Sequence, residues 1–243
     1  MIKNTVSPQN DPMGAAIADY FNTSRAYKLR VMSDDFDEDE IPVTQLFRTF
    51  KEMSPIEQKA LQIAQGRILD VGAGSGCHSL ALQEMGKDVT AIEISTLSCE
   101  IMEKRGVDNV INANLFNKAF VGNYDTILML MNGSGIIGKL ENMELFFNRM
   151  KELLSPEGKI IMDSSDLKYL FEDEDGSYLI DIAGDYYGEI RYSMKYKDIE
   201  GEEFDWLYID YPTMSLYASQ YGFKTELIQE GEHYDYLASL SIK

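Results

Sequence analysis

One stretch of the chain combines an aspartate, three closely spaced glycines and, further on, a glutamate. Asp70 comes just before Gly72, Gly74 and Gly76, and Glu93 follows Gly72 by 21 residues (93 − 72). Glycines at this spacing let the backbone turn sharply and let a ligand lie against bare peptide. In βαβ units, a carboxylate about 20 residues after such a turn holds ribose hydroxyls. The spacing therefore predicts a site for a nucleotide-like ligand.

The charge beside the glycine turn distinguishes between two kinds of ligand. Dinucleotide sites have their third glycine five residues after the first, where this chain has Cys77; Gly76 comes one residue early. A pyrophosphate would also be repelled by the carboxylate of Asp70. A cationic sulfonium that carries an ammonium group would be attracted by it. The pattern therefore favours a cationic ligand over a dinucleotide.

The elements that must position these residues alternate between strands and helices. Short apolar runs predict buried strands, over residues 68–71, 89–92, 110–113, 124–130 and 159–163. A helix with apolar residues at helical spacing is expected over residues 143–154. Strands that alternate with helices form a mostly parallel sheet, and ligands bind at the carboxyl ends of its strands.

The pattern Asp-x-Gly-x-Gly-x-Gly with a downstream acid resembles the class I S-adenosylmethionine-dependent methyltransferases. The resemblance extends over residues 54–165. It implies a Rossmann-like α/β fold with a doubly wound sheet of seven strands, mostly parallel with an antiparallel last strand. It also implies S-adenosylmethionine as cofactor and in-line methyl transfer to a small molecule. The acceptor atom cannot be read from the sequence.

The resemblance assigns roles to the residues around the turn. Glu93 is expected to bind the ribose, and Ile94 to lie against the adenine. Asp70 would hold the ligand's ammonium group or order the glycine turn. His78, at a positively charged helix start, should stay neutral and either contact the donor's amino-acid end or pack. Asn114 stands where many relatives have the Asp that accepts from the adenine amine. The predicted cofactor residues also include Leu115, Met131 and the three glycines.

Other candidates come from their chemistry. The ligand's carboxylate needs a partner, and a guanidinium binds carboxylate in a two-pronged way, so we expect Arg48 to supply it. Asn132 and Asp166 follow predicted strands and are candidates to orient an acceptor. His233 could remove a proton from the acceptor, although the turn that carries it is expected at the edge of the sheet away from the cofactor.

The chain is expected to form a single domain, residues 1–243. Residues 1–55 would be an N-terminal cap and residues 56–165 the cofactor-binding core. Residues 187–210 predict an inserted β-hairpin that covers the substrate. Ser54, followed by Pro55 and by Glu57, predicts a helix start with a capping box.

Composition narrows the partners. The 22 basic and 41 acidic residues give a net charge of −19, which disfavours a nucleic acid as acceptor. The acid runs 34–40 and 172–175 are interpreted as solvated loops, and no metal is expected. No apolar run could span a membrane and no export leader is visible. With Cys77 and Cys99 on predicted helices, the cytoplasm is the expected location. A monomer or homodimer is expected.

Two alternatives to this interpretation stay open. An NAD-dependent Rossmann oxidoreductase would also use Glu93, but Asp70 and the early Gly76 argue against it. A relative that binds S-adenosylmethionine without methylating would share the same motif.

Overall fold

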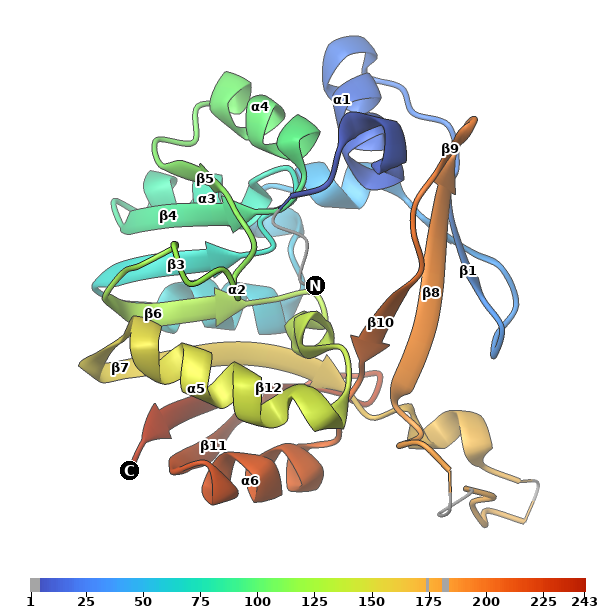
Figure 1. The fold of residues 1–243 in the computed structure, drawn as a ribbon, viewed down its shortest axis with the longest axis vertical. Coiled ribbons are helices and arrows are strands. Elements are labelled where there is room, and N and C mark those ends of the chain that lie inside the picture. Colours follow the sequence, from blue (N-terminus) through green and yellow to red (C-terminus); the bar gives the residue numbers. More distant parts are fainter. Residues whose placement is uncertain (1–4, 174, 181–183) are drawn as a thin grey trace.

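A seven-stranded sheet forms the core of the molecule (Figure 1). The structure is a computed structural model that describes residues 5–173, 175–180 and 184–243; Glu174, in the second acid run, lies outside these ranges. Within them, the core strands follow the order β11-β12-β7-β6-β3-β4-β5. Their bounds are β3 Arg67–Val71, β4 Asp88–Glu93, β5 Val110–Asn112, β6 Tyr124–Met129, β7 Leu154–Ser165, β11 Phe223–Glu230 and β12 Asp235–Ile242.

Strand direction brings several carboxyl ends to one edge of this sheet. β3 runs parallel to β4 and β6, β4 to β5, and β6 to β7. β12 runs antiparallel to both β7 and β11. Its first residue, Asp235, pairs with Ser165, the last residue of β7. The predicted mostly parallel sheet with an antiparallel last strand is confirmed.

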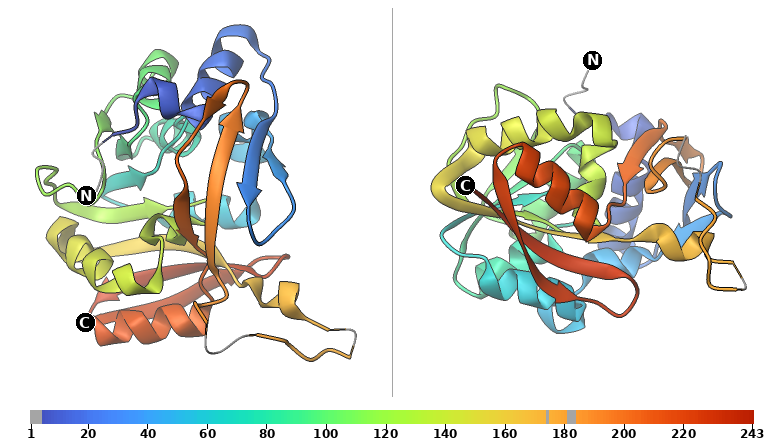
Figure 2. Two further views of the ribbon diagram at one scale, coloured as in Figure 1. Left: turned by 45° about the vertical axis from the view of Figure 1, so that its right-hand side comes forward. Right: turned by 90° about the horizontal axis from the view of Figure 1, so that it is seen from below.

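Helices cover both faces of the core sheet (Figure 1, Figure 2). Ile127 and Met129 of β6 pack toward α5 and α6, whereas Leu128 packs toward α2 and α3. This alternation follows from the two-residue period of a strand. The helices are α1 Pro12–Thr23, α2 Pro55–Ile63, α3 Cys77–Glu84, α4 Thr96–Arg105, α5 Met143–Leu153 and α6 Tyr211–Gln220. Among the described residues, no helix is long and apolar enough to cross a membrane.

The start of α2 has the predicted capping box. The Ser54 hydroxyl accepts from the backbone N–H of Glu57, and a Glu57 carboxylate oxygen accepts from the N–H of Ser54 at 2.9 Å. The helix ends at Ile63. Because the box uses one Glu57 oxygen, the other is available to the site described below.

A second sheet stands beside the carboxyl edge of the core (Figure 2). In the described ranges it has five strands, in the order β10-β8-β1-β2 with β9 on β8. They are β1 Leu29–Ser33, β2 Asp39–Ile41, β8 Glu189–Tyr196, β9 Ile199–Glu200 and β10 Phe204–Leu207. The sequence indicated the pair β8 and β10, but not that β1 and β2 extend it. The first acid run contains the β1–β2 connection.

Buried hydroxyl groups attach this second sheet to the core. The Ser134 hydroxyl donates to the Leu207 carbonyl at 2.8 Å, and the Ser164 hydroxyl accepts from the Ile209 N–H at 2.9 Å. The Ser134 and Ser164 hydroxyl oxygens also lie within hydrogen-bond distance of each other, 2.7 Å apart. Short 3₁₀ helices connect the elements: Pro8–Asn10, Val43–Phe47, Phe50–Glu52, Gly133–Ile137, Leu140–Asn142 and Leu167–Phe171.

We predict that Gly76→Ala destabilises the protein by about 1–3 kcal/mol, because Gly76 has a left-handed φ of +82° and an added Cβ would lie 2.9 Å from both Met102 and Val107. Gly86→Ala is the matched control: its φ is +74°, but its Cβ would meet nothing within 4 Å. Denaturant unfolding should show a clearly larger loss for Gly76→Ala. Equal losses would mean that close packing at Gly76 contributes nothing.

Candidate active site

The glycine turn leaves β3 at the carboxyl edge of the core. Gly72, Gly74 and Gly76 all have positive φ. A Cβ at Gly74 would meet nothing within 4 Å, so this part of the turn faces open space. Asp70 is buried beneath the turn and accepts a 2.6 Å hydrogen bond from the Ser79 hydroxyl. Because Ser79 belongs to α3, this contact joins the end of β3 to the helix that follows the turn.

Glu93 ends the neighbouring strand β4 with its carboxylate against the turn. One carboxylate oxygen accepts from the Gly74 N–H at 3.0 Å and the other from the Ser95 N–H at 2.9 Å. Burial raises the pKa of Glu93. Ile94, the next residue, is 40% exposed, an unusual position for a large apolar side chain beside a buried acid. The pair offers a hydrogen-bonding group and an apolar face side by side.

The N-terminal cap reaches this same point. Val6 donates its N–H to the Ile94 carbonyl at 2.8 Å. Asp11 caps α1 by accepting from the Gly14 N–H at 2.7 Å, and it also accepts from the Ser95 hydroxyl at 2.5 Å. The cap is therefore bonded to the loop that holds Glu93.

Two further predicted residues follow β5. The Asn114 side-chain oxygen accepts from the Phe116 N–H at 2.8 Å, and Leu115 is buried. The side-chain oxygen of Asn114 therefore has a partner within its own loop.

Arg48, Glu57 and His78 form a buried charged network. One Glu57 oxygen lies 2.5 Å from an Arg48 nitrogen and 2.9 Å from Nε2 of His78. Burial alone would raise the pKa of Glu57, but its bond to His78, the His78 charge, the Ser54 N–H and the Arg48 charge lower it to about 2. Glu57 is therefore ionised at neutral pH.

The same network changes the expectation for His78. Burial disfavours the protonated ring, but the hydrogen bond to Glu57 and the charges of Asp70 and Glu57 outweigh burial and raise the pKa of His78. The prediction that the helix start keeps this imidazole neutral is wrong in direction. The carboxylates of Glu57 and Asp70 favour the protonated ring, and their effect on the pKa is larger than that of burial.

Arg48 also faces the end of β6. One guanidinium nitrogen lies 3.5 Å from the Met131 sulfur. Arg48 Nε is buried and, within the described residues, has no hydrogen-bond partner. A buried N–H without a partner costs free energy, so this group fits an anionic ligand atom. Met131 and Asn132 both have positive φ, of 64° and 56°, which is uncommon for residues other than glycine.

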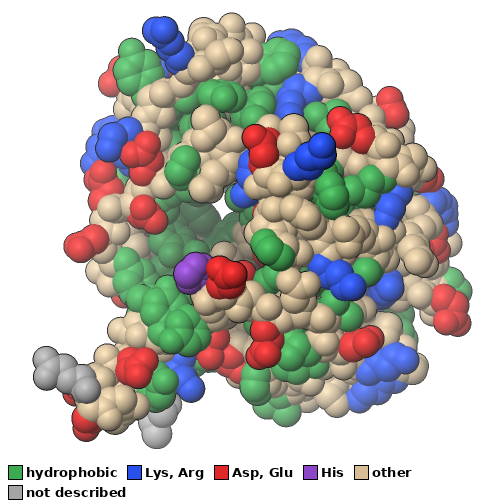
Figure 3. Space-filling model, turned by 180° about the vertical axis from the view of Figure 1, so that it is seen from behind, with side chains coloured by type: hydrophobic (Ala, Val, Ile, Leu, Met, Phe, Trp, Pro, Cys, Tyr) green, Lys and Arg blue, Asp and Glu red, His purple; other side chains and the backbone are tan. Residues whose placement is uncertain are grey.

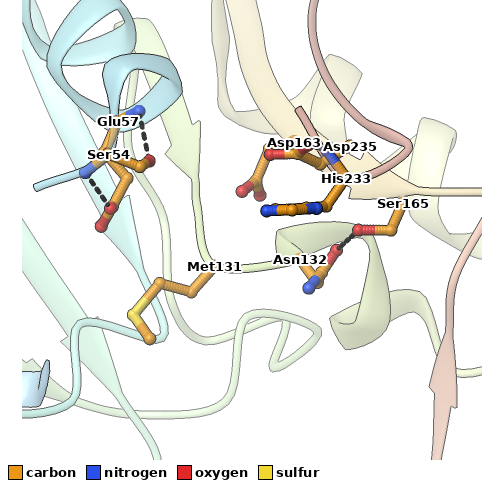
Figure 4. Close-up of a pocket in the computed structure, with 8 residues that line it drawn as sticks. All are labelled: Ser54, Glu57, Met131, Asn132, Asp163, Ser165, His233 and Asp235. Atoms are coloured by element: carbon orange, nitrogen blue, oxygen red, sulfur yellow. Dashed lines mark hydrogen bonds between the residues drawn. The ribbon is translucent and has the colours of Figure 1, made fainter. Parts of the chain in front are cut away.

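A cavity of about 310 Å³ opens beside Met131 (Figure 4). Its walls come from the start of α2, the ends of β6 and β7, and the start of β12. The lining residues are Ser54, Glu57, Met131, Asn132, Asp163, Ser165, His233 and Asp235. Figure 3 shows this side of the molecule hollowed, with apolar side chains inside the hollow and acidic side chains on its rim.

The three predicted acceptor residues have different outcomes. Asn132 lines the cavity, with its side-chain oxygen accepting from the Ser165 hydroxyl at 2.7 Å. His233 also lines it; the expectation that its turn lies at the far edge is wrong, because β12 runs antiparallel to β7 and begins beside that strand's carboxyl end. Asp166 does not line the cavity. It accepts hydrogen bonds from the Lys168 N–H and the Tyr187 hydroxyl, both at 2.8 Å.

Sequence reasoning missed two acids of the cavity. Glu57 was assigned only a capping role, and Asp163 only the end of a strand. Asp163 follows the apolar run 160–162, and an ionisable residue at the carboxyl end of a core strand is the signal that had identified Glu93. Within the described residues, no cluster of His, Cys, Asp and Glu has the arrangement of a metal site.

Comparisons with known proteins identify the class. A family model described as a methyltransferase domain matches residues 69–162. An S-adenosylmethionine-dependent methyltransferase from Bacteroides fragilis, solved with S-adenosyl-L-homocysteine, is 62% identical, covers 98% of both chains and has a TM-score of 0.93. The chain therefore belongs to the class I S-adenosylmethionine-dependent methyltransferases. It is an enzyme of this class, and S-adenosylmethionine is its cofactor.

More distant relatives share the fold. The DhpI complex with SAM and HEP is 16% identical, covers 98% of this chain and 100% of that one, and has a TM-score of 0.61. The cypemycin N-terminal methyltransferase from Streptomyces sp is 28% identical over 102 residues. That match spans only 41% of this chain and 42% of the curated relative.

We predict that Glu57→Gln destabilises the protein by about 3 kcal/mol near pH 5.5, because it leaves buried Arg48 and His78 without their charged partner. The lowered pKa of Glu57 stabilises the fold above its ordinary value of 4.5, and this contribution is lost as the pH falls toward 2. The raised pKa of His78 stabilises it below the ordinary 6.5, and this contribution is lost as the pH rises through the folded value.

The difference between wild type and Glu57→Gln should therefore be largest between about pH 4.5 and 6.5 and shrink on both sides. Urea unfolding over a pH series measures it, with Glu144→Gln, an exposed acid of α5, as the control that should follow wild type. If the difference in unfolding free energy between wild type and Glu57→Gln does not vary with pH, Glu57, Arg48 and His78 do not interact as charged groups.

Proposed function

We propose that the protein transfers a methyl group from S-adenosylmethionine to a small-molecule acceptor that binds in the cavity beside Met131. The observation that carries this proposal is the cavity itself. It has the size of a small-ligand pocket and opens at the carboxyl edge of the sheet, the edge that also carries the glycine turn and Glu93. Met131 lines the cavity and contacts Arg48, so it lies between the cavity and the Arg48 guanidinium.

The donor would be held along the ends of β3 and β4. Glu93 accepts hydrogen bonds from the ribose hydroxyls, Ile94 lies against the adenine, and Asn114 accepts from the adenine amine. Gly74 lets the ligand approach the backbone. Support comes from the exposed Ile94 side chain and from the open space at Gly74.

The donor's carboxylate would bind Arg48. Its unpartnered Nε supports this assignment, because a carboxylate would satisfy an N–H that is otherwise buried without a partner. Glu57, which is itself bonded to His78, holds the guanidinium in place. S-adenosylmethionine supplies an electrophilic methyl group on a positively charged sulfur. The residues of this chain then have to align the acceptor with the S–CH₃ bond and exclude water.

The second sheet would act as the cover over this edge. Trp206 of β10 packs so closely against Gly135 that any Cβ there would overlap its ring. Gly135 follows Asn132 in the same loop, so the cover contacts the element that lines the cavity. Because β8 lies in the middle of the sheet, deleting residues 187–210 would remove the partner of β1. Substitution of Trp206 is therefore the gentler way to test the cover.

We predict that Glu93→Ala weakens binding of S-adenosyl-L-homocysteine at least about tenfold, because a charge-assisted hydrogen bond contributes about 1.5–3 kcal/mol. Glu100→Ala, at an exposed acid of α4, is the control and should bind like wild type. Isothermal titration calorimetry measures both, after circular dichroism has verified that the variants fold. An unchanged dissociation constant in folded Glu93→Ala would remove Glu93 from the donor site.

The acceptor class is tested by supplying labelled methyl donor with a cell extract separated into small metabolites, protein and RNA. We expect the label to enter the small-metabolite fraction, because a chain with a net charge of −19 repels a phosphate backbone. Trp206→Ala should keep donor binding but lower this transfer. Transfer to RNA or protein alone, at moderate salt, would overturn the proposed function.

A further inference from the structure

Carboxylates outnumber basic groups in the lining of the cavity. Its lining includes three carboxylates and one imidazole, and no lysine or arginine among the described residues. Glu57 is already compensated by Arg48 and His78. Among the described residues that line the cavity, the imidazole of His233 is the one basic group beside the carboxylates of Asp163 and Asp235.

Of the two aspartates, Asp163 is held in place by a hydrogen bond from the backbone of the neighbouring loop. It lies near the end of β7, only 9% exposed, and accepts from the Gly133 N–H at 3.0 Å. Figure 4 shows its carboxylate and the His233 ring projecting into the cavity side by side. Burial raises the pKa of Asp163 to about 6, although hydrogen bonds from the backbone N–H groups of Gly133 and Asn132 lower it.

Other charged groups surround Asp163 on every side. Glu57 of α2 raises its pKa further and His78 of α3 lowers it. Tyr236 of β12 interacts electrostatically with Asp163, and Asp235, at the start of the neighbouring strand β12, also lines the cavity. The negative charge of Glu57 and the positive charge that the raised pKa of His78 favours offset each other, which leaves Asp163 and Asp235 as the excess charge of the cavity. The cavity therefore stays acidic around pH 7.

We propose that the acceptor is an amine, which enters the cavity as an ammonium ion and forms a hydrogen bond with Asp163. This inference rests on the proposed function and specifies its substrate class. A carboxylate, phosphate or phosphonate acceptor would meet only repulsion from the two uncompensated acids, and it would find no guanidinium or ammonium group to bind. A neutral hydroxyl acceptor would leave the buried charge of Asp163 unpaired, whereas an ammonium ion would pair with it.

An ammonium ion has no lone pair, so it must lose one proton before it can react. Asp163 accepts that proton, and the open rim of the cavity lets the proton exchange with water. The amine nitrogen then forms the new N–C bond with the methyl carbon as the S–C bond breaks and its electron pair goes to sulfur. The positive charge moves from sulfur to nitrogen, and no other reactant is needed.

The test uses three probes that share one ring and differ in the head group: benzylamine, benzyl alcohol and benzoate. Each is titrated by calorimetry into wild-type protein saturated with S-adenosyl-L-homocysteine. We expect benzylamine to bind at least about tenfold more tightly than the other two at pH 7.5. Binding should weaken as the pH falls below about 6 and Asp163 gains a proton. Equal binding of the three, tighter binding of benzoate, or no binding of benzylamine at millimolar concentration would overturn the inference.

The variant Asp163→Asn removes the carboxylate charge and leaves the shape of the side chain unchanged. The variant keeps the oxygen that accepts from Gly133, and it should lose the preference for benzylamine and the pH dependence while still binding S-adenosyl-L-homocysteine. Asp88→Asn, at the opposite edge of the sheet where β4 begins, should behave like wild type. A preference that survives in Asp163→Asn would remove Asp163 from the acceptor site.

The two proposals fail in different ways. Labelled methyl groups in small metabolites, with no preference for benzylamine, would overturn the amine inference and leave the proposed function standing. Labelled RNA or protein alone would overturn the proposed function itself.

Discussion

The placement of one buried carboxylate holds the candidate site together. Glu57 is almost fully buried, which costs several kcal/mol unless its charge is paired. Arg48 from the N-terminal segment and His78 from α3 supply the pairing, and the capping box at Ser54 uses the remaining oxygen. The N-terminal segment, the start of α2 and the start of α3 are thereby fixed around one group. Removing any one of them leaves an unpaired charge in the interior, so the cap and the core hold each other in position.

This arrangement explains how the two halves of the site can have different chemistry. On the donor side, Glu93 and the glycine turn present hydrogen-bonding groups on rigid backbone, and Arg48 keeps a buried N–H for an anion. On the proposed acceptor side, Asp163 and Asp235 lie in a cavity that has no lysine or arginine among its described lining residues. Met131 and Asn132, with their left-handed backbone, separate the two. Strain at such positions persists only when the surrounding structure enforces it, and here the loop is attached to the second sheet through Ser134.

Local patterns in the sequence predicted the parts of the fold that depend on local physics. The glycine turn, Glu93 and the Ser54 capping box are all short-range features, and the alternation of strands and helices indicated the parallel core. The second sheet was only half predicted, because β1 is recruited by β8, more than 150 residues away. His233 was misplaced because its position depends on the direction of β12. His78 was expected to be neutral because its carboxylate neighbours come from other elements. Asp163 was missed because the cavity that it lines is formed by four elements that meet only in the folded chain.

The central claim is that donor and acceptor meet at one edge of the sheet, between Glu93 and Asp163. A crystal structure of the protein with S-adenosyl-L-homocysteine tests it most directly. The account predicts ribose hydroxyls on Glu93, the ligand carboxylate on Arg48 and the sulfur facing the cavity beside Asn132. A sulfur directed away from that cavity, or a ligand carboxylate that leaves Arg48 bound only to Glu57, would contradict it.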